Sequence, residues 1–290
     1  MSRSVFLPVI LCAASVAPMV MMAQGDGTDG PPNVLVIQRE FVKPGKGGMM
    51  HQKTEGAFVQ ALKANHLDIH YLAMTSLTGQ DRAVFMNGYA TYADWEAETK
   101  STMKNAATEA ALEHANVADG DLLSETDTSV WERRDNLSLN NHGLTGDRYM
   151  ELIVYSIKPG HDAEWDAEVK MVKAGYEKGV PDASWTMFES RFGVNGHEYL
   201  IVIPMKSLGM IDVMMSSDKA FEDAMGMDGL KKLSELNAAC VETSKENLFA
   251  FSPRMSNPPE AWVKAEPDFW APKKMTPMKK EEKKETMKPM

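Results

Sequence analysis

Two stretches of the chain, 115 residues apart, share the same order of predicted elements, and this repeat limits the possible folds more than any other feature. Each copy opens with an apolar, β-branched run that ends in Lys-Pro-Gly, at 43–45 in the first copy and 158–160 in the second. At the same offset, the segment beginning at His70 aligns with the segment beginning at Trp185. Because the order is preserved without a gap, we expect two copies of one module.

Each copy is expected to follow the order strand, helix, strand, strand, helix, strand. The runs 34–42 and 150–157 predict the opening strands, and Pro-Gly after each run is typical of a turn. In the second copy, apolar residues recur at the spacing of one helical face: Trp165, Val169, Val172 and Tyr176. The other expected elements are strands at 70–75, 83–89, 129–133, 184–188, 198–203 and 247–251, with helical regions at 92–116 and 211–237.

The order βαββαβ is that of the ferredoxin-like unit, in which two helices pack on one face of an antiparallel sheet. We therefore predict an α+β fold with tandem ferredoxin-like modules at 33–134 and 148–252, joined by a polar linker at 135–147. Between Ser252 and Lys273, five prolines argue against regular structure, and the Lys-, Glu- and Met-rich end from Lys273 is expected to be disordered. This gives a disordered tail at 253–290.

Residues 1–23 are predicted to be a secretory signal peptide. Arg3 precedes an almost wholly apolar run, and Ala23 offers a small residue for cleavage. A retained membrane anchor is the alternative, although Pro8 and Pro18 interrupt the run. We expect cleavage and export to the periplasm or the extracellular space, with no membrane span left in the mature chain. Cys240 would then be its single cysteine, expected as a small buried residue rather than a nucleophile.

The formal net charge of −10 limits the partners of the chain. A phosphate backbone is bound by clustered Lys and Arg, so an acidic body disfavours a nucleic acid. It does not exclude a small organic molecule. The sequence also lacks the dinucleotide fingerprint, the Walker loop, the Gly-x-Ser-x-Gly elbow and the His-Glu-x-x-His pair. No cofactor and no metal site is predicted.

The opening strands resemble those of the dimeric α/β-barrel superfamily, in particular its antibiotic biosynthesis monooxygenase-like and NIPSNAP-like branches. The resemblance rests on Phe41-Val-Lys-Pro-Gly and Ser156-Ile-Lys-Pro-Gly, each of which leads into a predicted helix, and covers 33–252. It implies that two modules press their sheets together into a barrel, here from one chain, with a pocket between sheet and helices. Members include cofactor-independent monooxygenases, haem degraders and isomerases, so the resemblance does not set the function.

Polar residues in the predicted strands are the candidate site residues. Gln38 and Glu40 share one face of the first strand, and Arg39 lies on the other face. An enclosed Glu40 would have a raised pKa and would serve as a base, whereas a Glu40 on a solvated strand end would not. Polar groups in an apolar cavity orient a ligand. The candidate pocket residues are Gln38, Arg39 and His70, together with Tyr155 and Trp185, which align with Glu40 and His70 in the second copy.

The histidines and methionines suggest metal chemistry only weakly. His66 and His70 have a spacing that suits zinc on a helix, but they lie at the start of a predicted strand. His114 resembles in placement the helix histidine that binds haem iron in haem-degrading relatives. His51 and His161 follow the Pro-Gly turns and are expected to be solvated. The methionines clustered at 210–227 would suit Cu(I), but we expect them to fill a core.

Three classes of function remain open. The first is an exported protein that binds a small apolar molecule in a barrel pocket. The second is a cofactor-independent monooxygenase or isomerase that acts on an apolar substrate in the same pocket. The third is a structural or interaction protein whose Lys-rich tail contacts the cell envelope.

Overall fold

The computed structural model describes residues 30–271 except 105 and 145. The predicted signal peptide at 1–23 and the Lys-rich end from Lys273 lie outside the described residues. Among the described residues, no helix has both the length and the apolar character needed to cross a membrane.

The first half of the chain forms four strands and three helices. In chain order these are β1 (Val34–Val42), α1 (Met49–Ala64), β2 (Leu72–Ser76), β3 (Arg82–Tyr89), α2 (Tyr92–Thr102), α3 (Ala106–Gly120) and β4 (Leu123–Arg133). The single helical region predicted at 92–116 is thus two helices. The side chains of Ser101 and Thr102 donate hydrogen bonds to the carbonyls of Glu98 and Thr99, which competes with continuation of α2.

The second half forms four strands and two long helices. In chain order these are β5 (Tyr149–Ile157), α4 (Asp162–Gly179), β6 (Thr186–Phe192), β7 (His197–Met205), α5 (Gly209–Cys240) and β8 (Val241–Phe251). Between the halves, a short 3-10 helix, η1 (Asp135–Leu137), carries the fully buried Leu137. The predicted polar linker is therefore packed against the body of the protein at this point.

Within the described part of the chain, eight antiparallel strands close into a barrel in the order β1-β3-β2-β8-β5-β7-β6-β4. Each half contributes four adjacent strands in the same order, β4-β1-β3-β2 and β8-β5-β7-β6. The halves join where β2 pairs with β8 and where β4 pairs with β6. The fold is therefore α+β, with two ferredoxin-like halves in one pseudo-dimeric barrel. That the halves are copies of one ancestral unit remains a prediction.

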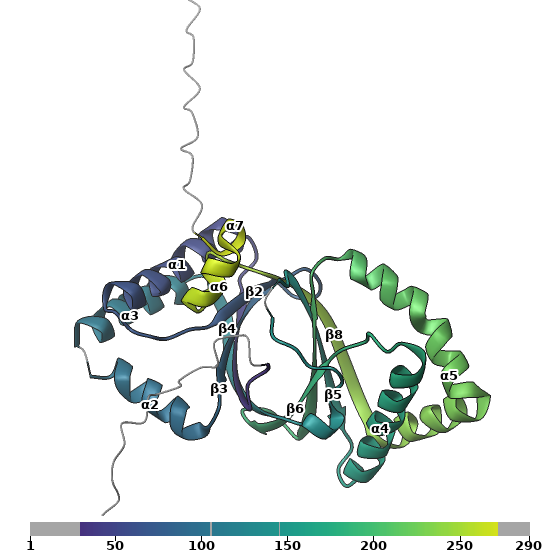
Figure 1. Cartoon of the computed structure of the whole chain (residues 1–290). Coiled ribbons are helices and arrows are strands. Elements are labelled where there is room, and N and C mark those ends of the chain that lie inside the picture. Colours follow the sequence, from purple (N-terminus) through teal and green to yellow (C-terminus); the bar gives the residue numbers. More distant parts are fainter. Residues whose placement is uncertain (1–29, 105, 145, 272–290) are drawn as a thin grey trace, which may run out of the picture.

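Alternation along each strand divides its side chains between the barrel interior and the helices. On β1, Leu35 and Ile37 point inward and join a large apolar core, whereas Val34 and Val36 point outward. The helices lie outside the barrel, with α1 and α3 beside the first half and α4 and α5 beside the second half (Figure 1). Each site can therefore be assigned either to the interior or to a helix-covered face.

Helix α5 is mostly exposed. Of its side chains only Cys240 is buried, which confirms the expectation that this residue is buried. Gly226 has a φ of 66° and interrupts the helix at a kink. The prediction that the clustered methionines fill a core is wrong for Met215 and Met227, which are 68% and 88% exposed, because α5 packs mainly against α4 rather than against the sheet.

The sequence predicted no regular structure after Ser252, and for the described residues up to 271 this prediction is wrong. Two short helices, α6 (Glu260–Ala265) and α7 (Pro267–Trp270), follow the last strand. Pro259 and Pro267 lie at the start of these helices, where a missing N–H costs nothing. Trp262 and Trp270 are buried against the barrel core, so α6 and α7 cover one end of the barrel (Figure 1).

Candidate functional site

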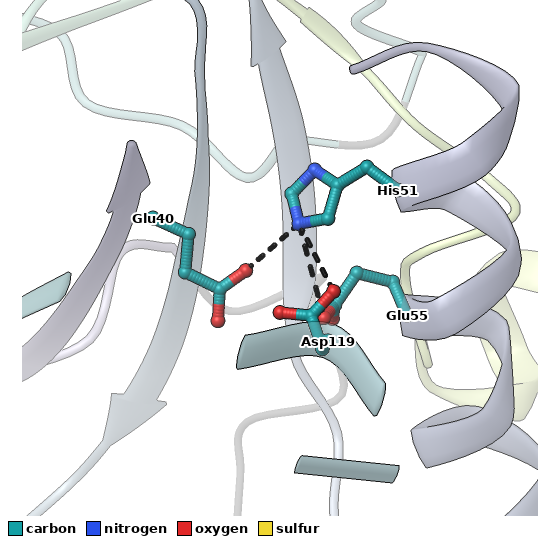
Figure 2. Close-up of side chains that lie close together, drawn as sticks. All are labelled: Glu40, His51, Glu55 and Asp119. Atoms are coloured by element: carbon teal, nitrogen blue, oxygen red, sulfur yellow. Dashed lines mark hydrogen bonds and ion pairs between the residues drawn. The ribbon is translucent and has the colours of Figure 1, made fainter. Parts of the chain in front are cut away.

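Four buried ionisable side chains meet on the outer face of the first half (Figure 2). Glu40 comes from β1, His51 and Glu55 come from α1, and Asp119 comes from α3. They are 4%, 3%, 3% and 2% exposed, respectively. One ligand atom from each residue lies within 4.8 Å of the others. Among the described residues, this acidic cluster is the one group of at least three such side chains whose ligand atoms converge in this way.

The elements bring these side chains together for simple geometric reasons. Glu40 alternates outward from β1, toward the helices. His51 and Glu55 are four residues apart, so they lie one turn apart on the same face of α1. Asp119 lies near the end of α3, which packs against α1, and the Thr54 hydroxyl donates a 2.6 Å hydrogen bond to Asp119 Oδ1.

His51 is the centre of the cluster. Its Nε2 lies 3.1 Å from Glu40 Oε2, 3.5 Å from Asp119 Oδ1 and 4.0 Å from Glu55 Oε1 (Figure 2). The Gln38 amide donates a 2.6 Å hydrogen bond to the other oxygen of Glu40. Gln38 thereby fixes the Glu40 carboxylate with Oε2 toward His51.

The cluster has more acidic groups than cationic partners. Among the ion pairs of the described residues, the three carboxylates have only His51 as a basic partner. Burial, followed by the charges of Glu40 and Asp119, raises the pKa of Glu55 from 4.5 to about 10. Glu55 Oε1 is buried without a hydrogen-bond partner in the described structure. Glu55 therefore holds a proton at neutral pH unless a cation replaces it.

The donor set matches a divalent transition-metal ion. Three carboxylate oxygens and one imidazole nitrogen suit Mn²⁺, Fe²⁺ and Zn²⁺, whereas Cu(I) prefers sulfur. In this structure the four ligand atoms lie within 4.8 Å of one another. Metal–ligand distances of about 2.0–2.2 Å require these atoms to lie somewhat closer together. Small side-chain rotations would close that difference.

The described residues of the second half contain no equivalent cluster. Shifted by the repeat offset, Glu40, His51 and Glu55 align with Tyr155, Asp166 and Lys170. Helix α4 instead places Glu168 where it accepts hydrogen bonds from Cys240 Sγ at 3.0 Å and Asn237 Nδ2 at 2.8 Å. The acidic cluster therefore distinguishes the two halves.

Burial and the nearby Glu168 raise the pKa of the Cys240 thiol, which keeps the sulfur protonated. A protonated, fully buried thiol is a poor nucleophile. This agrees with the sequence-based expectation that Cys240 is a structural residue.

Two cavities lie at opposite ends of the barrel interior. The cavity beneath α6 has a volume of about 360 Å³. Its lining is mainly apolar and includes Leu35, Met86, Met150, Phe188, Val202 and Trp262. The other cavity has a volume of about 270 Å³ and combines an apolar floor with Arg39, Arg82 and Lys245. Neither cavity is lined by the residues of the acidic cluster.

The structure distributes the five candidate pocket residues over several places. Gln38 lies beside the acidic cluster, Arg39 lines the 270 Å³ cavity and His70 lines the 360 Å³ cavity. Tyr155 packs on Trp165, with ring centroids 5.0 Å apart, and Trp185 packs on Tyr176 at 5.4 Å. No single pocket unites them within the described structure. Glu40, the candidate base, is in the acidic cluster.

The expectation that His51 is solvated is wrong. As the third residue of α1, it lies on the helix face that packs against β1, whereas the side chain of His161 is 40% exposed. Glu55 and Asp119 were not identified from the sequence. The signal that was available is His51-x-x-x-Glu55, a pair of ligand types at helical spacing. His66 and His114 are exposed, and His70 forms a 2.8 Å ion pair with Asp68.

No protein-family model and no curated protein sequence matches the chain. Several solved structures are similar in fold. A proposed monooxygenase from Fusobacterium nucleatum is 11% identical, with a TM-score of 0.48, over 75% of this chain and 91% of that chain. A mutant chlorite dismutase from Candidatus Nitrospira defluvii is 10% identical, with a TM-score of 0.45, over 82% and 96% of the two chains. An anthrone oxidase-like protein is 11% identical, with a TM-score of 0.46, over 76% and 92%. Likeness at this level does not carry over an activity.

Proposed function

We propose that this protein binds one divalent transition-metal ion at Glu40, His51, Glu55 and Asp119. The observation that supports the proposal is the convergence of four buried ligand groups within 4.8 Å, one of which, Glu55 Oε1, lacks a hydrogen-bond partner among the described residues. Buried charges ordinarily pair with an opposite charge or coordinate a metal. A divalent cation at the centre would supply the missing partner and balance the carboxylates.

The surrounding residues are suited to hold such an ion. Gln38 orients Glu40 and Thr54 orients Asp119, as outer hydrogen-bond partners do in metal sites. Because the ligands come from β1, α1 and α3, an ion there would tie both helices to the barrel. The near-complete burial of the site and its separation from both cavities favour an ion that stabilises the first half over one that acts on a bulky substrate.

The proposal is tested by replacing the central ligand. His51→Ala is expected to weaken binding of Mn²⁺ or Zn²⁺ by at least about 100-fold, because the one nitrogen ligand is lost. His161→Ala is the matched control, since His161 occupies a similar place beside the second Pro-Gly turn but is partly exposed. Isothermal titration and elemental analysis of the chelator-treated full chain would measure affinity and stoichiometry.

A bound ion should also raise the melting temperature, because a ligand that binds only the folded state stabilises it by about 2.7 kcal/mol at 100 times its Kd. This rise should be absent in His51→Ala and present in His161→Ala. The proposal fails if the wild-type chain takes up none of Mn²⁺, Fe²⁺ and Zn²⁺, or if both variants bind as the wild type does.

A second candidate function is the binding of a small apolar molecule in the 360 Å³ cavity. The supporting observation is the apolar lining under α6, with His70 and Arg133 as polar groups at the margin. The monooxygenase or isomerase alternative would use the same cavity. Export and contact with the cell envelope also remain predictions, because the segments that carry them lie outside the described residues.

Filling this cavity tests the second candidate. The neutral fluorophore N-phenyl-1-naphthylamine is expected to bind the wild type and to lose at least about tenfold in affinity in Val202→Phe, because the added ring takes its space. Val213→Phe on the exposed side of α5 is the control. Equal fluorescence titrations for the two variants would exclude this cavity as the binding site.

A further inference from the structure

The end of the barrel opposite α6 combines an apolar floor with a cationic rim. The 270 Å³ cavity there is lined by Trp131, Leu152 and Phe249 from the barrel core. Three basic side chains also line it: Arg39, Arg82 and Lys245. No Asp or Glu is part of this lining. In a chain with a net charge of −10, this concentration of positive charge needs an explanation.

Among the described residues, one of the three cations forms an ion pair. Arg39 forms a 2.6 Å ion pair with Asp127 and also contacts Ser129. Arg82 donates a 2.9 Å hydrogen bond to the carbonyl of Gln80. Among the ion pairs of residues 30–271, none includes Arg82 or Lys245. Two positive charges at this end of the barrel therefore form no ion pair among the described residues, and Asp127, which pairs with Arg39, is the carboxylate that interacts with Arg82 from a greater distance.

Arg82 is held in place by aromatic rings. Its guanidinium carbon lies 5.0 Å from the centroid of Phe249 and 5.9 Å from that of Phe41. Burial, followed by the charge of Arg39, lowers the pKa of Arg82. A guanidinium that is partly desolvated beside another cation gains from an anion more than an exposed one does.

We propose that this cavity binds a small organic monocarboxylate with an aromatic body. The carboxylate would lie between Arg82 and Lys245, and the apolar body would contact Trp131 and Phe249. The planar fork of arginine matches the two oxygens of a carboxylate, and the aromatic floor distinguishes such a ligand from inorganic phosphate. Asn247 and Gln80, also in the lining, offer further polar groups at the rim.

The proposal is independent of the metal site. Arg39 and Glu40 are consecutive residues on β1, but their side chains point to opposite faces, Arg39 into the barrel and Glu40 toward the helices. The wall of the barrel therefore separates the two sites. Loss of one binding activity should leave the other intact.

The probe is 2-naphthoate, measured by isothermal titration with the full chain at low salt. We expect binding that weakens as salt is added, and a loss of about tenfold in affinity in each of Lys245→Gln and Arg82→Gln, as one charge-assisted contact is removed. Lys170→Gln, on the outside of α4, is the control and should bind as the wild type does. Val202→Phe in the other cavity should also leave 2-naphthoate binding unchanged.

The neutral analogue 2-naphthylmethanol separates charge recognition from apolar binding. Its affinity should be the same in the wild type and in Lys245→Gln. Lys245 is exposed and has no ion pair in the described structure, so its replacement decides the matter even if Arg82→Gln fails to fold. The proposal is overturned if 2-naphthoate does not bind, if Lys245→Gln binds it as tightly as the wild type, or if Val202→Phe alone weakens it.

Discussion

Glu55→Gln is expected to abolish tight metal binding and, at the same time, to stabilise the metal-free protein. The amide cannot supply a carboxylate ligand, so the affinity for Mn²⁺ or Zn²⁺ should fall by at least about 100-fold. In the metal-free protein, however, the amide N–H can take the place of the protonated carboxyl in the hydrogen bond with Asp119 that helps to raise the pKa of Glu55, and the amide does not titrate. Opposite effects on metal affinity and on stability are expected for a site that is maintained for binding rather than for stability.

The pH dependence has a definite sign. The pKa of Glu55 is raised in the folded state from 4.5 to about 10. Below the unfolded pKa, Glu55 is protonated in both states and costs the metal-free wild type no stability. Stability is lost as the pH rises toward the folded pKa, because only the unfolded chain readily releases the proton. The advantage of Glu55→Gln should grow from about pH 5 up to the folded pKa, by at most about 1.4 kcal/mol per pH unit.

Urea unfolding in the presence of a chelator, at several pH values, measures this difference. Glu113→Gln, on the exposed side of α3, is the control and should show no such trend. Metal affinity should rise with pH in the wild type, because binding displaces the proton of Glu55. A Glu55→Gln variant that is less stable than the wild type at pH 8, or that binds metal normally, would contradict this account of the cluster.

Trp131→Ala is expected to cause the largest loss of stability of any single substitution considered, about 3–5 kcal/mol. Trp131 is 1% exposed, fills the barrel interior from β4 and donates a 2.8 Å hydrogen bond from its indole N–H to Ser129 Oγ. The strand that carries it pairs with β1 of its own half and β6 of the other half. A cavity there loosens the seam between the halves as well as the core.

Thermal unfolding should show a drop of roughly 6–20 °C in melting temperature for Trp131→Ala. Trp95→Ala is the matched control, because Trp95 lies on α2 and is only partly buried, beside Tyr89. Its loss should be less than half as large. Equal losses for the two variants would mean that the barrel interior contributes no more to stability than the helical surface.

The order of elements was predictable because local signals carry it, but several boundaries were not. The predicted strand 34–42 coincides with β1, whose apolar run ends at Pro-Gly. In contrast, β4 begins at Leu123 and β8 at Val241, six residues before the predicted starts of both strands. These extra segments are polar and exposed. Pairing with neighbouring strands, rather than an apolar pattern, makes them extended.

The candidate site was predictable only in part. Glu40 could be singled out because a charged residue in an apolar strand is unusual. The convergence of Asp119 with His51 depends on how α3 packs against α1, which no local pattern encodes. The helices α6 and α7 were also not predicted from the sequence. Prolines suggested disorder, whereas the two buried tryptophans among them, Trp262 and Trp270, were the stronger evidence for a packed segment.

Because a single chain closes the barrel, its two halves need not have the same sequence, as the subunits of a homodimer must. In a barrel of two identical chains, every substitution appears twice, and a residue suited to one outer face must also be tolerated on the other. Here the first half carries the acidic cluster on its outer face, whereas the second half carries a thiol and aromatic rings at the corresponding place. Each side can therefore change its chemistry alone, and the assembly of the barrel does not vary with protein concentration.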